Sequence, residues 1–397
     1  MRRSEQPKDH TKKSRMRFAV DAHAIGCHLT GNEVYIRNLL HEFSALDQEA
    51  EFVTYLSKPA ADSYIPERFL SRWVSENPFK RLGWDLGRHL RVDKPDLLHV
   101  QYTAPVFCSV PTVVSVHDVS YLDYPQYFTT FRAAQLRITV ARTVKRAAAI
   151  LTPSEFSKKA IVRAYGLDER KVFAIPNAVS SRFRQVPREH AQAALSRKFG
   201  IDGPFVLTVG DLQPRKNHLG LMAAFEDVIR AHPNLPHKLV MVGKETWYSE
   251  TLHQAARASA VSDRLIFTDF VEDEDLLDFY AGCDVFAFPS FYEGFGLPIL
   301  EAMACGRAVA CSNASAMPEV ANAAALLFDP ESKTEMARAL SDLMLDSELR
   351  MRMERLGAQR ATLFSWQRAA EQTLNVYYDV AGAPRRKAAT AGMRVSR

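Results

Sequence analysis

Two glutamates in one short segment are the residues whose types and spacing point most clearly to chemistry. Glu293 and Glu301 enclose two glycines and Pro298, and the segment follows the apolar run 284–288. This pattern predicts a strand, a tight glycine turn and a helix with the proline in its first turn. The N–H groups of a first helical turn bind phosphate, and glycines let the anion approach them. The segment therefore predicts a site for a nucleotide diphosphate.

The two carboxylates are expected to do different work in that site. Glu301 falls one turn inside the predicted helix, where its carboxylate can accept hydrogen bonds from two neighbouring ribose hydroxyls. Glu293 stays in the turn, where it can meet a second polar group of the same ligand. The spacing thus predicts one site with two separate carboxylate contacts.

A pair of adjacent cations forms the second candidate site. Arg215 and Lys216 follow the Gly210-Asp211 turn and precede a helix predicted to begin near His218. Two cations at a helix start oppose the helix dipole, which favours an anionic partner close by. A diphosphate fits, since arginine forks onto phosphate oxygens and both cations stabilise the charge that develops on a leaving nucleotide. A solvated surface pair is the alternative.

A histidine ends another apolar run. His117-Asp118 follows the predicted strand 112–116. A histidine in this place is either a hydrogen-bonded structural residue or, at a ligand-binding edge, a contact to the transferred group. Gly31, before the first predicted helix, permits close backbone approach. The segment around it lacks the full Gly-x-Gly-x-x-Gly fingerprint, so a nicotinamide dinucleotide is disfavoured.

Strand-length apolar runs alternate with amphipathic helical segments along the chain. The pattern predicts parallel sheets covered on both faces, and therefore an α/β fold with two doubly wound, Rossmann-like domains. The predicted strands of the first half lie near Phe18–Asp21, Phe52–Leu56, Leu97–Val100, Thr112–Val116, Ala149–Leu151 and Val172–Ile175. Those of the second half lie near Phe205–Val209, Lys238–Val242, Leu265–Phe267, Val285–Phe288, Ala308–Ala310 and Ala325–Phe328.

The chemically unusual residues all come just after predicted strands. Ligands of open parallel sheets bind at the carboxyl ends of the strands, where the strand order switches. If the two domains face each other with these edges inward, the motifs meet in one cleft.

Length and composition agree with this division. A chain of 397 residues with 47% apolar residues predicts two domains of roughly 180 residues each. We expect an N-terminal acceptor-side domain at 16–180, a linker at 177–187 and a donor domain at 195–364. The surplus aromatics of a last helix at about 365–382 suggest that it packs back on the first domain.

The formal charge of +5 is small, and the two ends, 1–15 and 383–397, are basic. We expect these ends to be disordered tails, solvated or weakly attracted to an anionic membrane. No run of about 20 apolar residues and no signal peptide is recognised, and five scattered cysteines indicate reduced thiols, so we expect a cytoplasmic protein. Within the cytoplasm, a position at the inner face of the membrane stays open.

Several other site types are disfavoured. The acidic run 273–275 opens a predicted helix, where carboxylates serve capping and dipole roles. The histidines and cysteines show no zinc spacing, and neither a Walker A loop nor a Gly-x-Ser-x-Gly elbow occurs. We therefore expect neither a metal site nor a cofactor.

Taken together, the motifs resemble one family: the retaining, nucleotide-sugar-dependent glycosyltransferases of family 4, which have the two-domain GT-B fold. The resemblance runs from about Arg17 to Trp366. The segments that carry it are the glutamate pair 293/301, Val209–Asn217, His117-Asp118, 153–157 and 175–179, in which Ala178 stands where the family often has glycine.

The resemblance implies roles for particular residues. Glu301 would bind the ribose, Arg215 and Lys216 the diphosphate, and Glu293 the donor sugar, with His117 near its reacting face. His117, Arg215, Lys216 and Glu293 would form the catalytic set. The implied donor-binding set is Gly31, Gly210, Arg215, Lys216, Val271, Glu293, Gly294, Phe295, Gly296, Leu297 and Glu301, in which Val271 would border the base.

The activity implied by the resemblance is metal-independent transfer of a hexosyl group, with retention, from a nucleotide diphosphate sugar to an acceptor hydroxyl. The donor would be linked to UDP, GDP or ADP, and the acceptor would be a bacterial polysaccharide or a lipid-linked glycan, with no nucleic-acid partner. Two alternatives stay open: a sugar-nucleotide hydrolase or epimerase of the same fold, and a non-catalytic sugar-binding homologue.

Overall fold

The structure is a computed structural model that describes residues 15–27 and 30–383. The chain divides into two compact units: one runs to Val114 and includes the segment from Leu374 onward, and the other is Ser115–Thr373. The predicted basic tails fall almost wholly on residues 1–14 and 384–397, outside the described part. None of the helices in the described part is long and apolar enough to cross a membrane.

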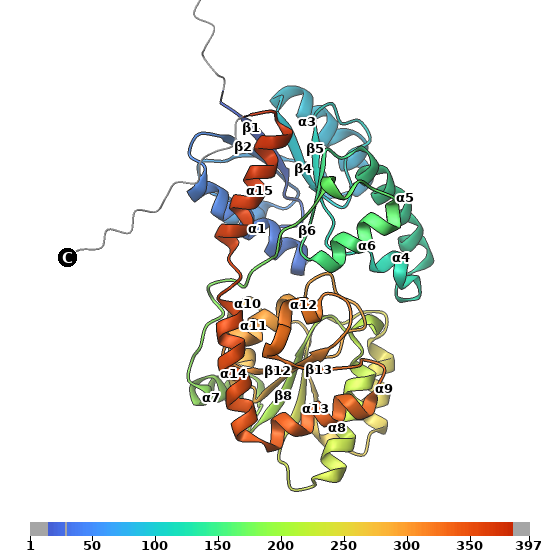
Figure 1. Cartoon of the computed structure of the whole chain (residues 1–397), viewed down its shortest axis with the longest axis vertical. Helices are drawn as coiled ribbons and strands as arrows, with labels where there is room; N and C mark the ends of the chain where they lie inside the picture. The colour runs from blue at the N-terminus through green and yellow to red at the C-terminus, as the bar shows by residue number, and fades with distance from the viewer. Residues whose placement is uncertain (1–14, 28–29, 384–397) are drawn as a thin grey trace, which may run out of the picture. The chain divides into compact units, whose positions relative to one another are not determined.

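Strands and helices alternate along the chain, and the strands form two parallel sheets (Figure 1). The first sheet has seven strands in the order β3-β2-β1-β4-β5-β6-β7. Their bounds are β1 Arg17–Asp21, β2 Glu51–Leu56, β3 Leu70–Trp73, β4 Leu97–Gln101, β5 Thr112–Ser115, β6 Ala149–Thr152 and β7 Val172–Ala174. Six of these strands match the predicted ones, while β3 was not predicted.

The second sheet has six strands in the order β10-β9-β8-β11-β12-β13. They are β8 Phe205–Val209, β9 Lys238–Val242, β10 Leu265–Phe267, β11 Val285–Phe288, β12 Ala308–Ser312 and β13 Leu326–Phe328. All six were predicted, and the observed pairs are parallel. The predicted α/β class with two doubly wound sheets is confirmed.

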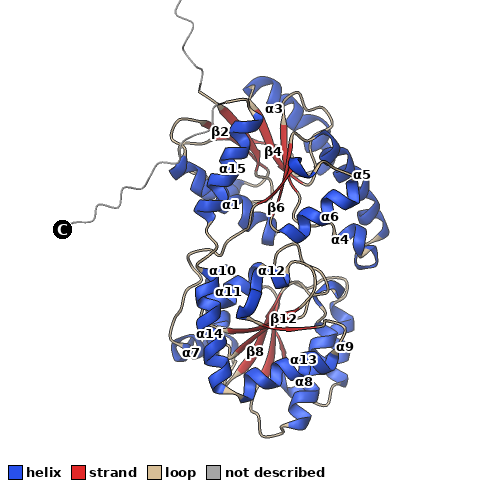
Figure 2. Ribbon diagram, in the orientation of Figure 1, coloured by secondary structure: helices blue, strands red, loops and turns tan. Residues whose placement is uncertain are grey.

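Helices cover both faces of these sheets (Figure 2). The helices that precede residue 200 are α1 Thr30–Leu46, α2 Pro78–Lys80, α3 Leu86–Asp93, α4 Ser120–Asp123, α5 Thr130–Arg146, α6 Glu155–Tyr165 and α7 Arg188–Phe199. Those that follow are α8 His218–Ala231, α9 Ser249–Ala258, α10 Asp273–Gly282, α11 Leu297–Ala304, α12 Met317–Ala321, α13 Lys333–Leu345, α14 Ser347–Ala361 and α15 Trp366–Val380.

The first unit has an aromatic core to which the end of the chain contributes. The Tyr377 ring of α15 packs 5.3 Å from that of Phe18 in β1 and 5.6 Å from that of Phe43 in α1. The Tyr377 hydroxyl lies 2.5 Å from Nδ1 of buried His99, and the Tyr378 hydroxyl donates to Asp47. The last turns of α15 therefore pack on the strands at the start of the chain, as Figure 1 shows in red beside blue.

The second sheet shows why its strands are apolar on both faces. Phe205, Leu207, Phe286 and Phe288 belong to one hydrophobic cluster with α10 and α11. Val206, Val285 and Ala287, whose side chains point to the other face of the sheet, belong to a second hydrophobic cluster with α8 and α13. Because side chains alternate across a strand with a period of two, burial on both faces demands a continuous apolar run.

The second sheet also fixes a switch point. From β8 the chain builds outward through β9 and β10, whereas β11, β12 and β13 build outward on the other side of β8. Strands β8 and β11 pair in parallel, so the turns that follow them leave the sheet at the same edge. Such an edge is where open α/β sheets bind ligands.

Candidate functional site

The turn after β8 carries two cations on a constrained backbone. Gly210 has a φ of +156°, its N–H donates to Val242 O at 2.8 Å, and Pro214–Lys216 form a 3₁₀ turn. Gly243, after β9, packs so closely that a Cβ would lie 2.0 Å from Gly210 O. This close approach requires glycine and holds the start of the turn in one place.

Asn217 ends that turn and joins it to α8. Its φ is +55°, and its side-chain Nδ2 donates to Pro330 O at 2.8 Å. Asparagine tolerates this left-handed conformation better than most residues. The next residue, His218, is buried, and burial together with Lys216 lowers its pKa to about 3. This segment therefore presents Arg215 and Lys216 from a rigid base.

The turn after β11 presents backbone in place of long side chains. Gly296, with a φ of +111°, is the N-cap of α11 and, as a glycine, gives that helix no side-chain cap. Pro298 lies in its first turn, as predicted. A Cβ on Gly294 would lie 2.0 Å from His117 O. The two glycines thus serve two different needs, an allowed backbone conformation at 296 and space at 294.

The two turns meet through charge. Glu293 Oε1 lies 2.8 Å from Arg215 Nη1 and 2.7 Å from Lys216 Nζ, and all three side chains are largely buried. Burial alone raises the pKa of Glu293, but the two cations outweigh it and lower that pKa to about 2. Glu293 is ionised at neutral pH, and the trio has a net charge of one positive unit. Lys216 also lies 4.9 Å from the centre of the Phe288 ring.

The Glu293 backbone is held as well. Its N–H donates to Ser315 Oγ at 2.9 Å, and its carbonyl accepts from Ala316 N at 3.3 Å. Arg215 Nη1 also donates to the carbonyl of Tyr292, and Arg215 O accepts from Phe291 N. The carboxylate is therefore positioned by its own backbone and by both cations.

His117 adjoins the Glu293 turn through its main chain. Ser154 Oγ donates to Gly294 O at 2.7 Å, while Ser157 Oγ lies 3.0 Å from Gly294 O and 3.2 Å from His117 O. We call Ser154 and Ser157 the serine clamp. A hydroxyl has one proton, so Ser157 serves these two carbonyls alternately or by a shared bond. The clamp joins the segments after β5 and β11.

Glu319 strengthens this junction. Its carboxylate, on α12, accepts from Glu155 N at 2.9 Å and from Phe156 N at 3.1 Å, the first N–H groups of α6. A carboxylate at a helix N-terminus is favoured by the helix dipole and by the unpaired N–H groups. Ser154, the N-cap of α6, also accepts from Ser157 N. The start of α6 is thus fixed against α12.

His117 is half-buried, and this burial keeps its imidazole neutral. Burial lowers its pKa to about 4, with Asp118 acting weakly in the opposite direction. At neutral pH the imidazole therefore offers one donor and one acceptor and no charge. Such a group suits a contact to a sugar hydroxyl.

Glu301 lies in α11, and Val271, predicted to border the base, lies between β10 and α10. Glu301, in α11, accepts a hydrogen bond of 2.6 Å from the Tyr280 hydroxyl. Burial and the nearby Glu301 hold the pKa of Tyr280 well above its usual value, so the phenol stays protonated and donates. Val271 and Phe295 are buried in one hydrophobic cluster, against which Leu297 packs.

One predicted residue lies elsewhere. Gly31 belongs to the first unit, in the first turn of α1, and a Cβ there would meet no atom within 4 Å. The remaining predicted residues all lie in the second unit. Of these, His117, Arg215, Lys216, Glu293 and Gly294 are joined by direct contacts.

Three residues that position the site were not singled out from the sequence. Tyr280 donates a hydrogen bond to Glu301, Ser315 accepts one from the Glu293 N–H, and Glu319 accepts one from the first turn of α6. The serine clamp lies in a motif that had been recognised without a role. A readable signal existed for Ser154 alone, since a serine before a helix is a preferred N-cap. The other contacts join residues far apart in the chain.

The arrangement is suited to anion binding and charge stabilisation. Two cations and an uncapped helix N-terminus lie at adjacent strand ends, with a carboxylate between the cations. In the described ranges, no group of three or more His, Cys, Asp or Glu side chains could hold a metal ion.

Comparison with known proteins gives family matches for most of the chain. Residues 29–183 match "Glycosyltransferase Family 4" and residues 192–360 match "Glycosyl transferases group 1". The chain is 32% identical over 267 residues to the O-antigen chain mannosyltransferase B of Escherichia coli, covering 67% of this chain and 69% of that protein. It is 29% identical over 275 residues to the serotype-specific mannosyltransferase WbdA of Escherichia coli, covering 66% of this chain but only 33% of WbdA.

Solved structures share the fold. Sucrose-phosphate synthase from Thermosynechococcus elongatus superposes with a TM-score of 0.76 at 20% identity, over 93% of this chain and all of that chain. Anabaena HepE in complex with UDP and glucose superposes with a TM-score of 0.71 at 18% identity, over 92% of this chain and all of that chain.

Proposed function

Because the chain belongs to the glycosyltransferases of family 4, which have the GT-B fold, we propose that it moves a hexosyl group from a nucleotide diphosphate sugar to an acceptor hydroxyl, with retention of configuration. The observation that carries this proposal is the meeting of Arg215 and Lys216 with Glu293 beside the uncapped start of α11. The site offers two cations and helix N–H groups to a diphosphate.

In the proposed reaction the bond between the anomeric carbon and the diphosphate oxygen breaks, and its electron pair leaves with the nucleotide. Arg215 and Lys216 stabilise the charge that develops on that oxygen. The acceptor hydroxyl enters on the same face, forms the new bond to carbon and passes its proton to the departing phosphate oxygen. The transition state resembles an oxocarbenium ion and needs no strong nucleophile.

Glu293, Glu301 and His117 position the donor in this proposal. Glu293, ionised and fixed at both ends, accepts hydrogen bonds from hydroxyls of the donor sugar. Glu301, oriented by Tyr280, accepts from the ribose. Neutral His117 contacts the reacting face of the sugar, and Val271 borders the base.

The relatives favour a mannosyl group and a bacterial surface polysaccharide or lipid-linked glycan as acceptor, since two of them are O-antigen or serotype mannosyltransferases. The complexes of HepE contain UDP and glucose. The donors to test first are therefore GDP-mannose and UDP-glucose.

A thermal-shift screen of nucleotide sugars tests the donor. At a ligand concentration of about 100 times Kd, binding adds roughly 2.7 kcal/mol to the free energy of unfolding, which raises Tm measurably. We expect stabilisation by one UDP-, GDP- or ADP-sugar and by its nucleotide diphosphate. Stabilisation by none of them contradicts the proposal.

A turnover assay separates the alternatives. The stabilising donor is incubated with a glycan acceptor and, in parallel, without one. A transferase forms the glycoside only with the acceptor. Fast release of free or epimerised sugar without acceptor indicates a hydrolase or epimerase, and donor binding without any turnover indicates a sugar-binding homologue.

A further inference from the structure

Helix α5 carries an unusual concentration of positive charge. Its 17 residues include Arg132, Arg137, Arg142, Lys145 and Arg146 and no aspartate or glutamate. The whole chain has 51 Lys and Arg against 46 Asp and Glu, so the two counts are equal outside α5. Helix α5 therefore carries five positive charges that no acidic residue of the same helix offsets.

The same helix exposes large apolar side chains. Phe131 is 74% and Ile138 69% exposed, whereas Val140 and Val144 on the opposite side are buried. Residues seven apart lie only about 20° apart around a helix, so Phe131, Ile138 and Lys145 form one outward stripe. We call it the α5 stripe. An outward face that combines aromatic, aliphatic and cationic side chains is typical of helices that lie on a membrane.

A groove adjoins the stripe. It lies among α4, α5 and α6, has a volume of about 750 Å³, and is lined by the cations Arg137, Lys145 and Arg163. Alanines line it as well: Ala133, Ala134, Ala141 and Ala164. Short apolar side chains beside cations suit a ligand with an anionic head and a hydrocarbon body.

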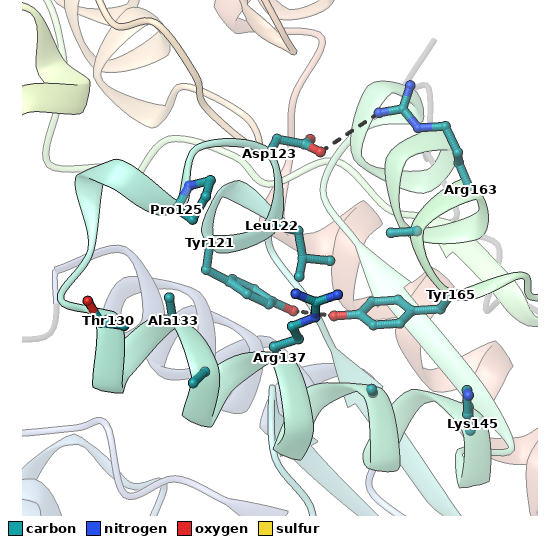
Figure 3. A pocket seen from close by; sticks show the side chains of 13 residues that line it. Tyr121, Leu122, Asp123, Pro125, Thr130, Ala133, Arg137, Lys145, Arg163 and Tyr165 are labelled. Atoms are coloured by element: carbon teal, nitrogen blue, oxygen red, sulfur yellow. Dashed lines mark hydrogen bonds and ion pairs between the residues drawn. The ribbon is translucent and has the colours of Figure 1, made fainter.

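Polar side chains also line the groove. The Tyr121 and Tyr165 hydroxyls lie 2.6 Å apart, and Arg137 reaches from α5 toward them (Figure 3). Arg163 lies 3.9 Å from Asp123, the one acidic side chain of the lining. Three cations against one carboxylate leave the groove with a net positive charge.

From these observations we propose that the α5 stripe and the adjoining groove dock the protein on an anionic phospholipid bilayer. Lipid phosphates meet Arg137, Lys145 and Arg163, while Phe131 and Ile138 enter the acyl-chain boundary. The exposed apolar pair favours lipid over nucleic acid, which offers charge without a hydrocarbon phase. The inference goes beyond the proposed transfer reaction and does not depend on it.

Vesicle sedimentation with the full chain tests the proposal. Large vesicles of zwitterionic phosphatidylcholine are compared with vesicles that also contain anionic phosphatidylglycerol, at low and high salt. We expect binding to the anionic vesicles only, weakened by salt because the cations are screened. Equal binding to both vesicle types, or to neither, overturns the proposal.

Paired variants locate the surface. Arg137→Gln with Lys145→Gln is expected to lower the partition coefficient about 25-fold, since each cation near an anionic surface contributes roughly fivefold. Phe131→Ser with Ile138→Ser is expected to lower it at least tenfold. These side chains are on the surface, and circular dichroism checks that each variant folds.

Helix α14 supplies matched controls. Met351→Ser with Leu356→Ser removes two exposed apolar side chains, and Arg352→Gln with Arg355→Gln removes two cations from a helix that also holds glutamates. Both controls should bind vesicles as the unchanged protein does.

A tail variant completes the test, with Arg385, Arg386 and Lys387 all replaced by glutamine. If it abolishes binding while the α5 variants bind normally, the tail is the docking element and the proposal fails. It also fails if heparin binds through α5 while anionic vesicles do not.

Discussion

Two strand-to-helix turns of one sheet solve the problem of anion binding in opposite ways. The turn from β8 to α8 uses long charged side chains on a backbone fixed by Asn217 and Gly243, whereas the turn from β11 to α11 uses glycines and main-chain groups. Both end on a residue of positive φ before an uncapped helix. Function in the first turn should therefore respond to changes of charge, and in the second to changes of shape.

The largest effect is expected from a larger side chain in the second turn. Gly294→Ala places a Cβ 2.0 Å from His117 O, a backbone atom that cannot move alone. We expect a loss of about 3 kcal/mol or more in the free energy of unfolding, measured by urea denaturation, and loss of transfer activity. Gly83→Ala is the matched control, because a Cβ there meets nothing within 4 Å. Normal stability of Gly294→Ala would falsify the packing described for this turn.

Charge comes next. Arg215→Ala is expected to lower kcat by about 10²-fold, with a smaller change in KM, because the cation is needed chiefly as charge develops on the leaving group. Its loss also raises the pKa of Glu293, which NMR titration can follow. Arg215→Lys should recover part of kcat. A change confined to KM would instead indicate that Arg215 only anchors the donor.

Glu301→Ala tests the ribose contact. We expect donor affinity, measured by calorimetry, to fall by about 1–3 kcal/mol with a smaller change in kcat. Tyr280→Phe removes the partner that orients the carboxylate and should give a weaker loss of the same kind. If both variants bind the donor normally, the assignment of Glu301 is wrong.

The serine clamp links the second turn to His117, and its removal should affect turnover. Ser154→Ala leaves the Gly294 carbonyl without a 2.7 Å donor and is expected to cost about 1–2 kcal/mol of stability. If the clamp positions Glu293 and His117, kcat falls while donor KM changes little, and Ser154→Thr restores it. A loss of stability with unchanged kcat would show a purely structural role.

The last effect is one of pH, and it belongs to the first turn. The pKa of His218, at the start of α8, is about 3 when folded, below its ordinary value of 6.5. The unfolded chain therefore binds more protons between these values, and stability falls as the pH drops below 6.5, by up to about 1.4 kcal/mol per pH unit. His218→Asn should flatten the measured slope between pH 6.5 and 5. An unchanged slope would contradict burial of a neutral His218.

Most strands were predictable because a strand that is buried on both faces needs a continuous run of apolar residues, which is visible in the sequence. The exception, β3, has the sequence LSRW and pairs only with β2 at the sheet edge, where its side chains are exposed or half-buried. An edge strand that is little buried does not need a regular arrangement of apolar residues, so its sequence gives little sign of it. Both turns of the candidate site were predictable too, since glycine, proline and charge follow directly on apolar runs.

The sequence by itself determined that the chain is α/β, that its reactive side chains follow strands and that two glycines precede α11. Local sterics and side-chain periodicity decide these features within a few residues. The tertiary structure alone decided that β11 pairs with β8, which brings Glu293 to Arg215 and Lys216 across more than 70 residues. It also decided that Ser154 reaches Gly294 across 140 residues. Strand order and long-range contacts depend on how the whole core packs, and no local pattern records that choice.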